Sequence, residues 1–344
     1  MANLRNRIMV ALAAALLMSA AASGDALPSP VAAPPPSVAS DDTVTIRALE
    51  GLRAADIRLG SIIYRLARAN VALCNRRSVL TGLLLHSLPT YSPEVRDVAK
   101  RHFAFASPIA VEGVVPDSPA ALADIRMDDS LVALDRVDLT MGTLDLATVN
   151  SRLEASPQAR AIGLDLLRRS DHITRQIVPV TGCAGHAEVR VTAELNAATD
   201  GMTIQVNSGL MNLLTSDDDL AALVAHELAH IILRHPERLT EAKVDRGILR
   251  DFGRNARLIR RTEIEADQLS VYLLANAGYD PAAAPHYLKT YGSRMGVNNI
   301  LAGSTHPRGK ERIKLMEAEV AKLAGQPSRP IIPAWVQSRA LPLG

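Results

Sequence analysis

The segment from Leu220 to His235 constrains the fold of this chain more than any other stretch, because its apolar residues recur at helical spacing until Pro236 ends the pattern. Within it, His226 and His230 stand four residues apart, and Glu227 follows the first histidine. Side chains four residues apart lie one above the other on a helix, so the two imidazoles face the same point. Glu227 is rotated by about 100° from His226 and lies beside that point. The sequence therefore predicts a buried helix that presents two imidazoles and one carboxylate together.

This spacing of histidines suits a tetrahedral Zn²⁺ ion bound by two ring nitrogens. Such an ion lowers the pKa of a bound water from ~15.7 to about 7, and Glu227 would accept the proton as general base and later pass it to the leaving group. A five-residue match of this kind also arises by chance on a solvated helix. The apolar neighbours argue against that alternative, because a buried glutamate between two histidines is costly without a metal. We therefore expect one zinc ion per chain and a hydrolytic reaction.

A catalytic zinc needs a third protein ligand and one open position. The helix predicted over Thr262–Ala277 holds three acids, Glu263, Glu265 and Asp267, of which the first and the last share one face. We favour Glu263 as the third ligand and Asp267 as the acceptor that orients a histidine ring. The further candidates for the third ligand are His235, Glu265, Asp267 and His306.

The N-terminus has the layout of a secretory signal peptide over residues 1–22. Two arginines precede an uncharged apolar run from Ile8 to Met18, and Ala20–Ala22 offers a cleavage site. An uncleaved membrane anchor is the alternative, although the run is shorter than the roughly 18–20 residues that span a bilayer. Residues 23–42 are rich in proline and alanine and predict a linker. We expect an exported protein, periplasmic in a bacterium, with no transmembrane helix in the mature chain.

The two cysteines of the chain, Cys74 and Cys183, would meet an oxidising compartment after export. We expect them to form a disulfide, with two buried free thiols as the alternative. The formal net charge of +2 gives no electrostatic reason to expect nucleic acid or an anionic membrane surface as a partner. The expected partners are therefore protein or peptide substrates, which can include membrane-proximal proteins.

Changes in residue pattern divide the rest of the chain into four parts. Helical periodicity over 43–106 predicts a helical region that packs on the catalytic domain, and short strands with two small helices over 107–181 predict a compact β/α module. Residues 182–325 combine strand patterns with the helices that carry the candidate ligands. Residues 326–344 contain four prolines and predict an extended tail. The expected fold class is α+β.

The β/α module resembles a PDZ domain. The resemblance is carried by Val114–Ala120, which contains a Ser-Pro-Ala turn, and by Ala123–Asp129 after it. The module departs from the family pattern at Asp124 and Asp128, which stand where glycines are usual, and no glycine-containing loop for a peptide carboxylate is evident around Phe103–Ile109. The resemblance implies a domain that binds peptides by adding a strand to the edge of a sheet.

The catalytic region resembles the M48 peptidase family, whose relatives include the HtpX-like, Oma1-like and Ste24-like proteases. The resemblance rests on His226–His230, on Glu263–Asp267, and on Ser304–Pro307 followed by Arg312. It implies a mainly helical, zincin-type domain with a small antiparallel sheet, in which the first of the three acids is a zinc ligand. It also implies that the segment Ser304–Pro307 borders the site and that His306 can reach the open zinc position and hold the enzyme latent, with Arg312 as a second candidate for a regulatory or fourth-position role. A loop histidine bonded to the backbone is the alternative for His306. The lack of apolar spanning segments is similar to the soluble, exported branch of the family.

Together these features predict a zinc-dependent endopeptidase that cleaves exported proteins that are misfolded or misassembled. Its substrate would lie extended along an edge strand formed by Ile204–Val206. One alternative is a chaperone-like or PDZ-type binding protein with a latent metal site, against which the intact Glu227 argues. Another is a metal-dependent hydrolase that acts on a bond other than the peptide bond.

Overall fold

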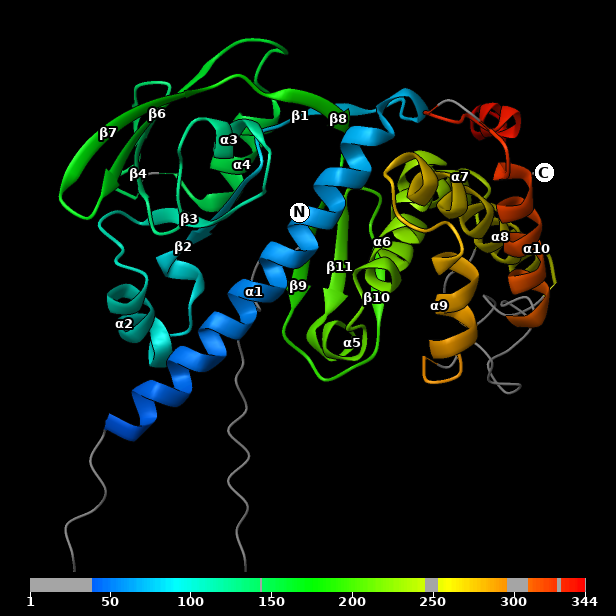
Figure 1. Cartoon of the computed structure of the whole chain (residues 1–344), viewed down its shortest axis with the longest axis horizontal. Coiled ribbons are helices and arrows are strands. Elements are labelled where there is room, and N and C mark those ends of the chain that lie inside the picture. The colour runs from blue at the N-terminus through cyan, green and yellow to red at the C-terminus, as the bar shows by residue number, and fades with distance from the viewer. Residues whose placement is uncertain (1–38, 143, 245–252, 296–308, 327–328, 344) are drawn as a thin grey trace, which may run out of the picture.

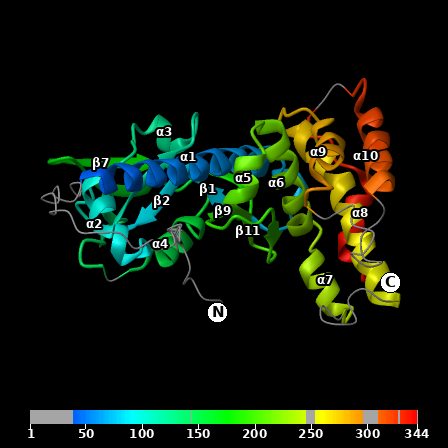
Figure 2. The same ribbon diagram turned by 90° about the horizontal axis from the view of Figure 1, so that it is seen from below.

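A single helix of 31 residues, α1 (Ala39–Ala69), runs between two modules of the structure (Figure 1, Figure 2). The computed structural model describes residues 39–142, 144–244, 253–295, 309–326 and 329–343. A predominantly β module lies on one side of α1, and a predominantly helical module lies on the other. The fold class is α+β, as predicted.

The helix α1 contributes to the core of the helical module and to a small cluster beside the β module. Its apolar stripe buries Leu59, Ile63 and Leu66 in the core of the helical module. Nearer its N-terminus, Leu49 packs in a separate cluster that contains Phe103. The helical spacing of this region fits one or two helices, and the structure has one. The two modules are therefore joined by a shared element rather than by a linker.

The β module is built on a six-stranded antiparallel sheet. Its strands follow the order β2 (Leu83–Ser87), β3 (Ile109–Val114), β4 (Ser130–Leu134), β6 (Ile162–Arg168) and β7 (Asp171–Ile177), and β5 (Val137–Asp138) pairs with β4. Two short helices, α3 (Pro119–Leu122) and α4 (Leu146–Glu154), pack against this sheet. The alternating residues Ile162, Leu164 and Leu166 of β6 are buried in a core separate from that of the helical module.

The β module begins earlier than the sequence predicts. The range 43–106, predicted to be helical, contains β1 (Arg77–Leu80) and β2 in addition to α1, α2 (Pro93–His102) and two 3-10 turns, η1 (Val71–Leu73) and η2 (Leu88–Thr90). β2 is an edge strand of the six-stranded sheet, and β1 pairs with β8 (Val180–Cys183) where the chain leaves the β module. The predicted boundary at 107 is therefore wrong, because short apolar runs fit a strand or a buried helical turn equally well.

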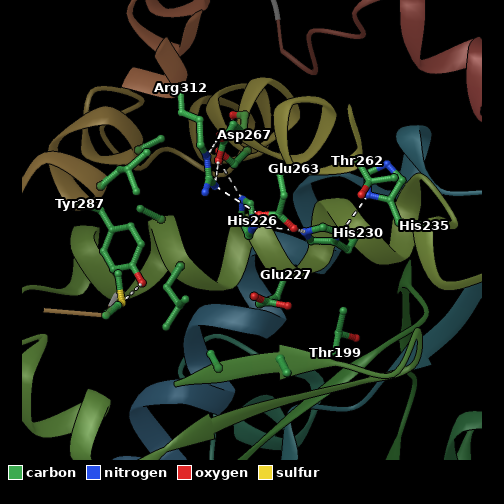
Figure 3. Close-up of a pocket in the computed structure, with 18 of the residues that line it drawn as sticks. Thr199, His226, Glu227, His230, His235, Thr262, Glu263, Asp267, Tyr287 and Arg312 are labelled. Carbon is green, nitrogen blue, oxygen red and sulfur yellow. Dashed lines mark hydrogen bonds and ion pairs between the residues drawn. The ribbon is translucent and has the colours of Figure 1, made fainter. Parts of the chain in front are cut away.

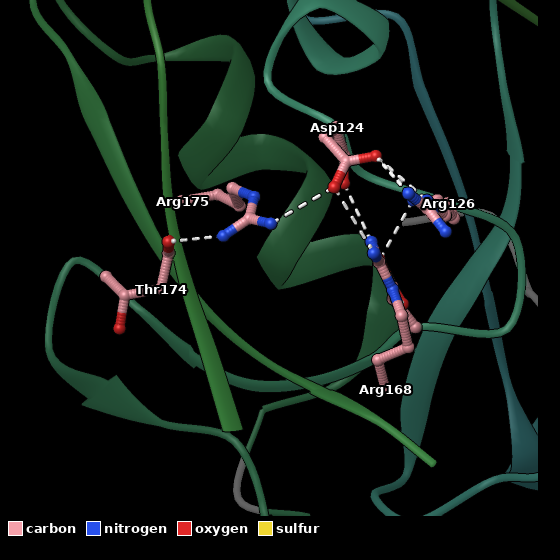
Figure 4. A network of polar contacts seen from close by, with 6 residues as sticks. Asp124, Arg126, Arg168, Thr174 and Arg175 are labelled. Atoms are coloured by element: carbon pink, nitrogen blue, oxygen red, sulfur yellow. Dashed lines mark hydrogen bonds and ion pairs between the residues drawn. The ribbon is translucent and has the colours of Figure 1, made fainter. Parts of the chain in front are cut away.

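A network of charged side chains surrounds Asp124, which lies at a turn of the β module (Figure 4). Asp124 and Asp128 adopt φ angles of 55° and 67°, in the left-handed region that glycine favours. The carboxylate of Asp124 accepts hydrogen bonds from Arg126 Nε at 2.8 Å and Arg175 Nη2 at 3.1 Å, and these bonds lower its pKa to about 2. Arg168 Nη1 adds a third contact at 3.3 Å. Aspartates thus keep the backbone of a glycine turn, and ion pairs hold it in place.

The helical module contains a three-stranded sheet with the order β10 (Ala197–Thr199), β11 (Thr203–Asn207) and β9 (His186–Arg190). β11 is antiparallel to β10 and parallel to β9, so the sheet is mixed. The prediction of a wholly antiparallel sheet is therefore wrong. Ile204–Val206 lies in β11, the central strand, and the prediction that it forms the edge is wrong. The edge beside the candidate site is β10, whose Ala-Ala-Thr stretch has no alternation of apolar and polar residues to mark it as a strand.

Helices make up the rest of this module. Among the described residues they are α5 (Ser208–Leu213), α6 (Asp217–Ile232), α7 (His235–Glu241), α8 (Gly253–Asn276), α9 (Ala283–Tyr291) and α10 (Gly309–Leu323). α6 lies at the centre, where it packs against α1, α8, α9 and the sheet, and it is buried along most of its length. α8 starts well before Thr262, the predicted start, and Gly278 follows its end with a φ of 72°.

A disulfide and the C-terminal tail close the fold around α1 and α8. Cys74 and Cys183 form the disulfide, with their Cα atoms 5.5 Å apart, and it joins the end of η1 to β8. The sequence predicts an extended tail, and this prediction is wrong for part of it. The tail forms η3 (Ala334–Ala340) and buries Val336 and Leu343. These two apolar side chains give the tail a surface on which to pack.

Some predictions concern residues at the N-terminus. The predicted signal peptide, residues 1–22, lies outside the described residues, as does most of the predicted linker, residues 23–42. α1 begins at Ala39, inside that linker. Within the described residues, we find no helix that combines the length and the hydropathy needed to cross a bilayer.

Candidate metal centre

α6 and α8 bring two histidines and a glutamate from distant parts of the sequence to one point (Figure 3). His226 and His230 occupy successive turns of α6, and their Nε2 atoms lie 3.1 Å apart. Glu263 of α8 faces both rings, with one carboxylate oxygen 3.6 Å from Nε2 of His226 and the other 3.6 Å from Nε2 of His230. Ligands held tetrahedrally at about 2.1 Å from a zinc ion lie about 3.4 Å from one another. The three side chains therefore fit a zinc ion with little rearrangement.

Asp267, one turn after Glu263 on α8, orients the ring of His226. Its Oδ1 lies 3.1 Å from Nδ1 of His226, which leaves Nε2 of that ring for a metal. Arg312 of α10 donates to both oxygens of Asp267, from Nε at 2.5 Å and from Nη2 at 2.7 Å. Nη2 of Arg312 also lies 3.5 Å from Glu263. The structure thus places both Asp267 and Arg312 beside the candidate ligands.

His230 has a different neighbour behind it. Nδ1 of His235 lies 2.9 Å from Nδ1 of His230, and Nε2 of His235 lies 3.2 Å from Oε2 of Glu265. Arg238 and Arg261 donate hydrogen bonds to the same carboxylate. The sequence makes His235 and Glu265 candidates for the third ligand, but the structure places them behind His230, with Glu263 in the ligand position.

The candidate site carries an excess of negative charge. Burial alone would raise the pKa of Glu263, but the two histidines and Arg312 lower it well below its ordinary value. Burial is likewise outweighed at Asp267, chiefly by the charge of Arg312, so the pKa of Asp267 is also lowered. Two carboxylates thus face one guanidinium, and the remaining negative charge favours a cation between the histidines.

The two histidines respond differently to this environment. Burial opposes the charged form of His226, but Asp267 and Glu263 outweigh it and raise its pKa to about 10. Burial lowers the pKa of His230 well below its ordinary value. A single positive charge is therefore accommodated at the pair, and a metal ion bound to both rings would take the place of that proton.

Glu227 lies on α6 between the two histidines and the strand that carries Thr199 (Figure 3). Its carboxyl is buried, and burial raises its pKa to about 7 against the lowering effect of His226. A carboxyl group with this pKa accepts and releases a proton near neutral pH. Glu227 can therefore exchange a proton near neutral pH beside the candidate ligands.

A cavity of about 760 Å³ opens beside these residues. The segment Leu195–Thr199, which includes β10, lines one wall. Apolar side chains from α6, α9, α10 and the turn after α9 line the far end, namely Leu223, Ala284, Tyr287, Leu288, Met295 and Met316. The hydroxyl of Tyr287 donates to the Met295 sulfur at 3.0 Å. The cavity thus runs from a strand edge, past Glu227, to an apolar end.

The structure gathers most of the predicted site residues. Those brought together are His226, Glu227, His230, Glu263, Asp267 and Arg312. His306 lies outside the described residues. The sequence gives no signal for Tyr287, because only the packing of α9 against α6 brings it to the cavity.

Among solved structures, the chain is similar to two proteins of the HtrA type. The HtrA-type protease AlgW with decapeptide has 17% sequence identity and a TM-score of 0.25, over 30% of each chain. The HtrA3 PDZ domain bound to a phage-derived ligand has 19% identity and a TM-score of 0.26, over 31% of this chain and 89% of that one. Likeness at these TM-scores carries no argument about the fold, so the PDZ-like character of the β module stays a prediction.

Two metalloendopeptidases are similar in sequence to about a third of the chain. The mitochondrial metalloendopeptidase OMA1 of Arabidopsis thaliana is 34% identical over 131 residues, which are 33% of this chain and 27% of that protein. OMA1 of Schizosaccharomyces pombe is 31% identical over 141 residues, 34% of this chain and 41% of that protein. The chain thus spans less than half the length of these relatives. Residues 150–249, which include His226, Glu227 and His230, match peptidase family M48. This segment makes up less than a third of the chain, and over it the chain is similar to peptidase family M48.

Proposed function

We propose that this protein is a zinc-dependent endopeptidase with a zincin-type active site. The observation that carries this conclusion is the arrangement of His226, His230 and Glu263, whose ligand atoms all lie within 4.8 Å of one another, with Glu227 beside them. Similarity to metalloendopeptidases supports the peptide bond as the target. A hydrolase for another kind of bond has no comparable support.

Three side chains would hold the ion, and a fourth would move the proton. When bound, the zinc ion would polarise the scissile carbonyl and make a water molecule acidic. Glu227 would take a proton from the attacking water and give it to the departing amine. Its pKa of about 7 suits both transfers near neutral pH. Asp267, held by Arg312, would keep the ring of His226 in its ligand orientation.

The outer edge of β10, which pairs with no other strand among the described residues, supports binding of an extended peptide. The N–H of Asn207 donates to the carbonyl of Asn196, and the N–H of Asp200 donates to the carbonyl of Thr203, so Asn196 and Asp200 face β11. Backbone groups alternate in direction along a strand, and those of Ala197 therefore point away from the sheet. An extended substrate would pair with this edge, as in other cases of strand addition. A large apolar side chain next to the scissile bond would then fill the apolar end of the cavity.

The β module supports recognition of a second segment of the substrate. A cavity of about 810 Å³ is lined by residues of β2, α4 and β9. β2 and β9 are both edge strands, each of its own sheet. Strand addition at β2 would be the PDZ-like mode of binding. The proposed role of the β module is thus to hold a protein substrate while another segment is cleaved.

The proposed setting is outside the cytoplasm, the periplasm if the source is bacterial, with misfolded or misassembled exported proteins as substrates. The signal-peptide pattern over residues 1–22 supports export. The disulfide between Cys74 and Cys183 suits an oxidising compartment. Control of activity would come from His306 occupying the open zinc position.

Peptide cleavage by the full chain tests this function. Wild type and Glu227→Gln are compared on an unfolded protein such as casein, with zinc content measured for both. We expect equal zinc content and a loss of cleavage of about 100-fold or more in the variant, since general bases contribute on that scale. Equal cleavage by both proteins would refute the peptidase assignment. If neither cleaves but both suppress aggregation of the substrate, the chaperone-like alternative takes its place.

A further inference from the structure

His230 contacts His235 (Figure 3), the first of a row of side chains outside the proposed ligand set that leads from the buried site toward the surface. Its Nδ1 lies 2.9 Å from Nδ1 of His235, whose Nε2 lies 3.2 Å from Oε2 of Glu265. The two rings stand nearly perpendicular, with an interplanar angle of 77°. Arg238 Nη1 and Arg261 Nε hold the Glu265 carboxylate at 2.9 Å and 2.7 Å. His235 is 1% exposed, so its partners in this row are protein groups.

The backbone changes direction to bring His235 to this place. On an uninterrupted helix His235 would lie about 140° around the axis from His230, on a different face. α6 ends at Ile232 instead, and Arg234 adopts φ 54° and ψ 39°, a left-handed conformation that is unfavourable for a residue with a side chain. α7 then begins with His235 itself. The left-handed turn thus directs the ring of His235 back onto His230.

The geometry permits one arrangement of protons when His230 binds a metal through Nε2. The neutral ring then carries its proton on Nδ1 and donates it to Nδ1 of His235. His235 must therefore accept at Nδ1 and carry its own proton on Nε2. That proton is donated to Glu265, which accepts as a carboxylate because Arg238 and Arg261 hold it.

We propose that His235 and Glu265 are positioning residues for the metal ion, which fix the tautomer and the orientation of His230. This role rests on the proposed zinc site. His226 contacts a carboxylate directly, that of Asp267, whereas His230 reaches one through a neutral imidazole. The two metal-binding rings are thus oriented by different side chains: a carboxylate orients His226, and the ring of His235 orients His230.

Zinc affinity of the full-length protein, measured by competition with a chromogenic chelator, tests this role without relying on catalysis. His235→Phe keeps a ring but removes both nitrogens, and Glu265→Gln keeps the side-chain shape but removes the charge. Loss of such partners costs 10–100-fold in metal affinity, so we expect a Kd increase of about 10–100-fold for His235→Phe and of about 10-fold or less for Glu265→Gln. The smaller effect follows because an amide oxygen still accepts from His235. His172→Phe, on exposed β7, is the matched control and should leave the Kd unchanged.

The tautomer of His235 is a second and independent readout. Imidazole ¹⁵N chemical shifts of the zinc-loaded wild type should show the His235 proton on Nε2, and this measurement decides the question even if His235→Phe does not fold. A proton on Nδ1 of His235, or an unchanged Kd in both variants, would overturn the positioning role. A wild-type protein that binds no zinc would instead overturn the proposed function, so the two failures are distinguishable.

Discussion

Replacing Arg312 by methionine is expected to cost about 3–5 kcal/mol of unfolding free energy, the usual cost of breaking a buried ion pair by removing one partner. Arg312 and Asp267 are 5% and 3% exposed, and the two hydrogen bonds between them measure 2.5 Å and 2.7 Å. Methionine keeps much of the side-chain volume but leaves the Asp267 carboxylate buried, with His226 as the ion-pair partner that remains to it. The loss should loosen α10 from α8.

Urea denaturation followed by circular dichroism, in EDTA so that metal binding does not contribute, measures this cost. Adding Asp267→Asn to the Arg312 variant should recover part of the loss, because the buried charge is then removed. Arg160→Met is the matched control, since Arg160 pairs with Asp135 at 3.3 Å on the surface and should contribute less than about 1 kcal/mol. If Arg312→Met costs no more than the control, the buried pair does not hold the site together.

Three further predictions concern Glu265, the edge of β10 and the apolar end of the cavity. At Glu265, burial is outweighed by the hydrogen bonds of His235 and Arg238, which lower its pKa to about 2 from 4.5. Its stabilisation is therefore present above about pH 4.5 and lost as the pH falls toward 2. Glu265→Gln should cost about 3 kcal/mol at pH 7 and much less at pH 3 by urea denaturation, and an equal cost at both would contradict this. Ala197→Pro removes an outward N–H of β10 and should lower kcat/KM for a long peptide by roughly 5–10-fold at unchanged zinc content, as expected for one hydrogen bond; no change would exclude pairing at β10. Met295→Ala enlarges the apolar end of the cavity and should shift cleavage of a peptide library toward larger apolar side chains, whereas an identical profile would remove this cavity from substrate recognition.

Local geometry explains why the candidate ligands are predictable from the sequence. His226 and His230 are related by helical spacing, and so are Glu263 and Asp267, so a correct helix assignment is enough to place each pair. The spacing of the two pairs from each other is not local. It depends on α6 packing against α8, and two things indicate it: the ligand chemistry of the four side chains and the resemblance to the M48 family.

Features that depend on backbone detail or tertiary packing escape prediction. His235 reaches His230 only through the left-handed turn at Arg234, which a helical pattern does not reveal. The edge strand at Ala197–Thr199 is too short and too uniform to show a period of two. The strand Leu83–Ser87 begins with three successive leucines and contacts both α1 and α4, so its pattern does not separate strand from helix.

The metal centre itself is tested most directly by X-ray diffraction from crystals of the zinc-loaded protein, recorded on either side of the zinc absorption edge. We expect one anomalous peak per chain, at about 2.0–2.2 Å from Nε2 of His226, from Nε2 of His230 and from a carboxylate oxygen of Glu263. No peak between these side chains, or a peak at which another residue takes the place of Glu263, would contradict the proposed centre.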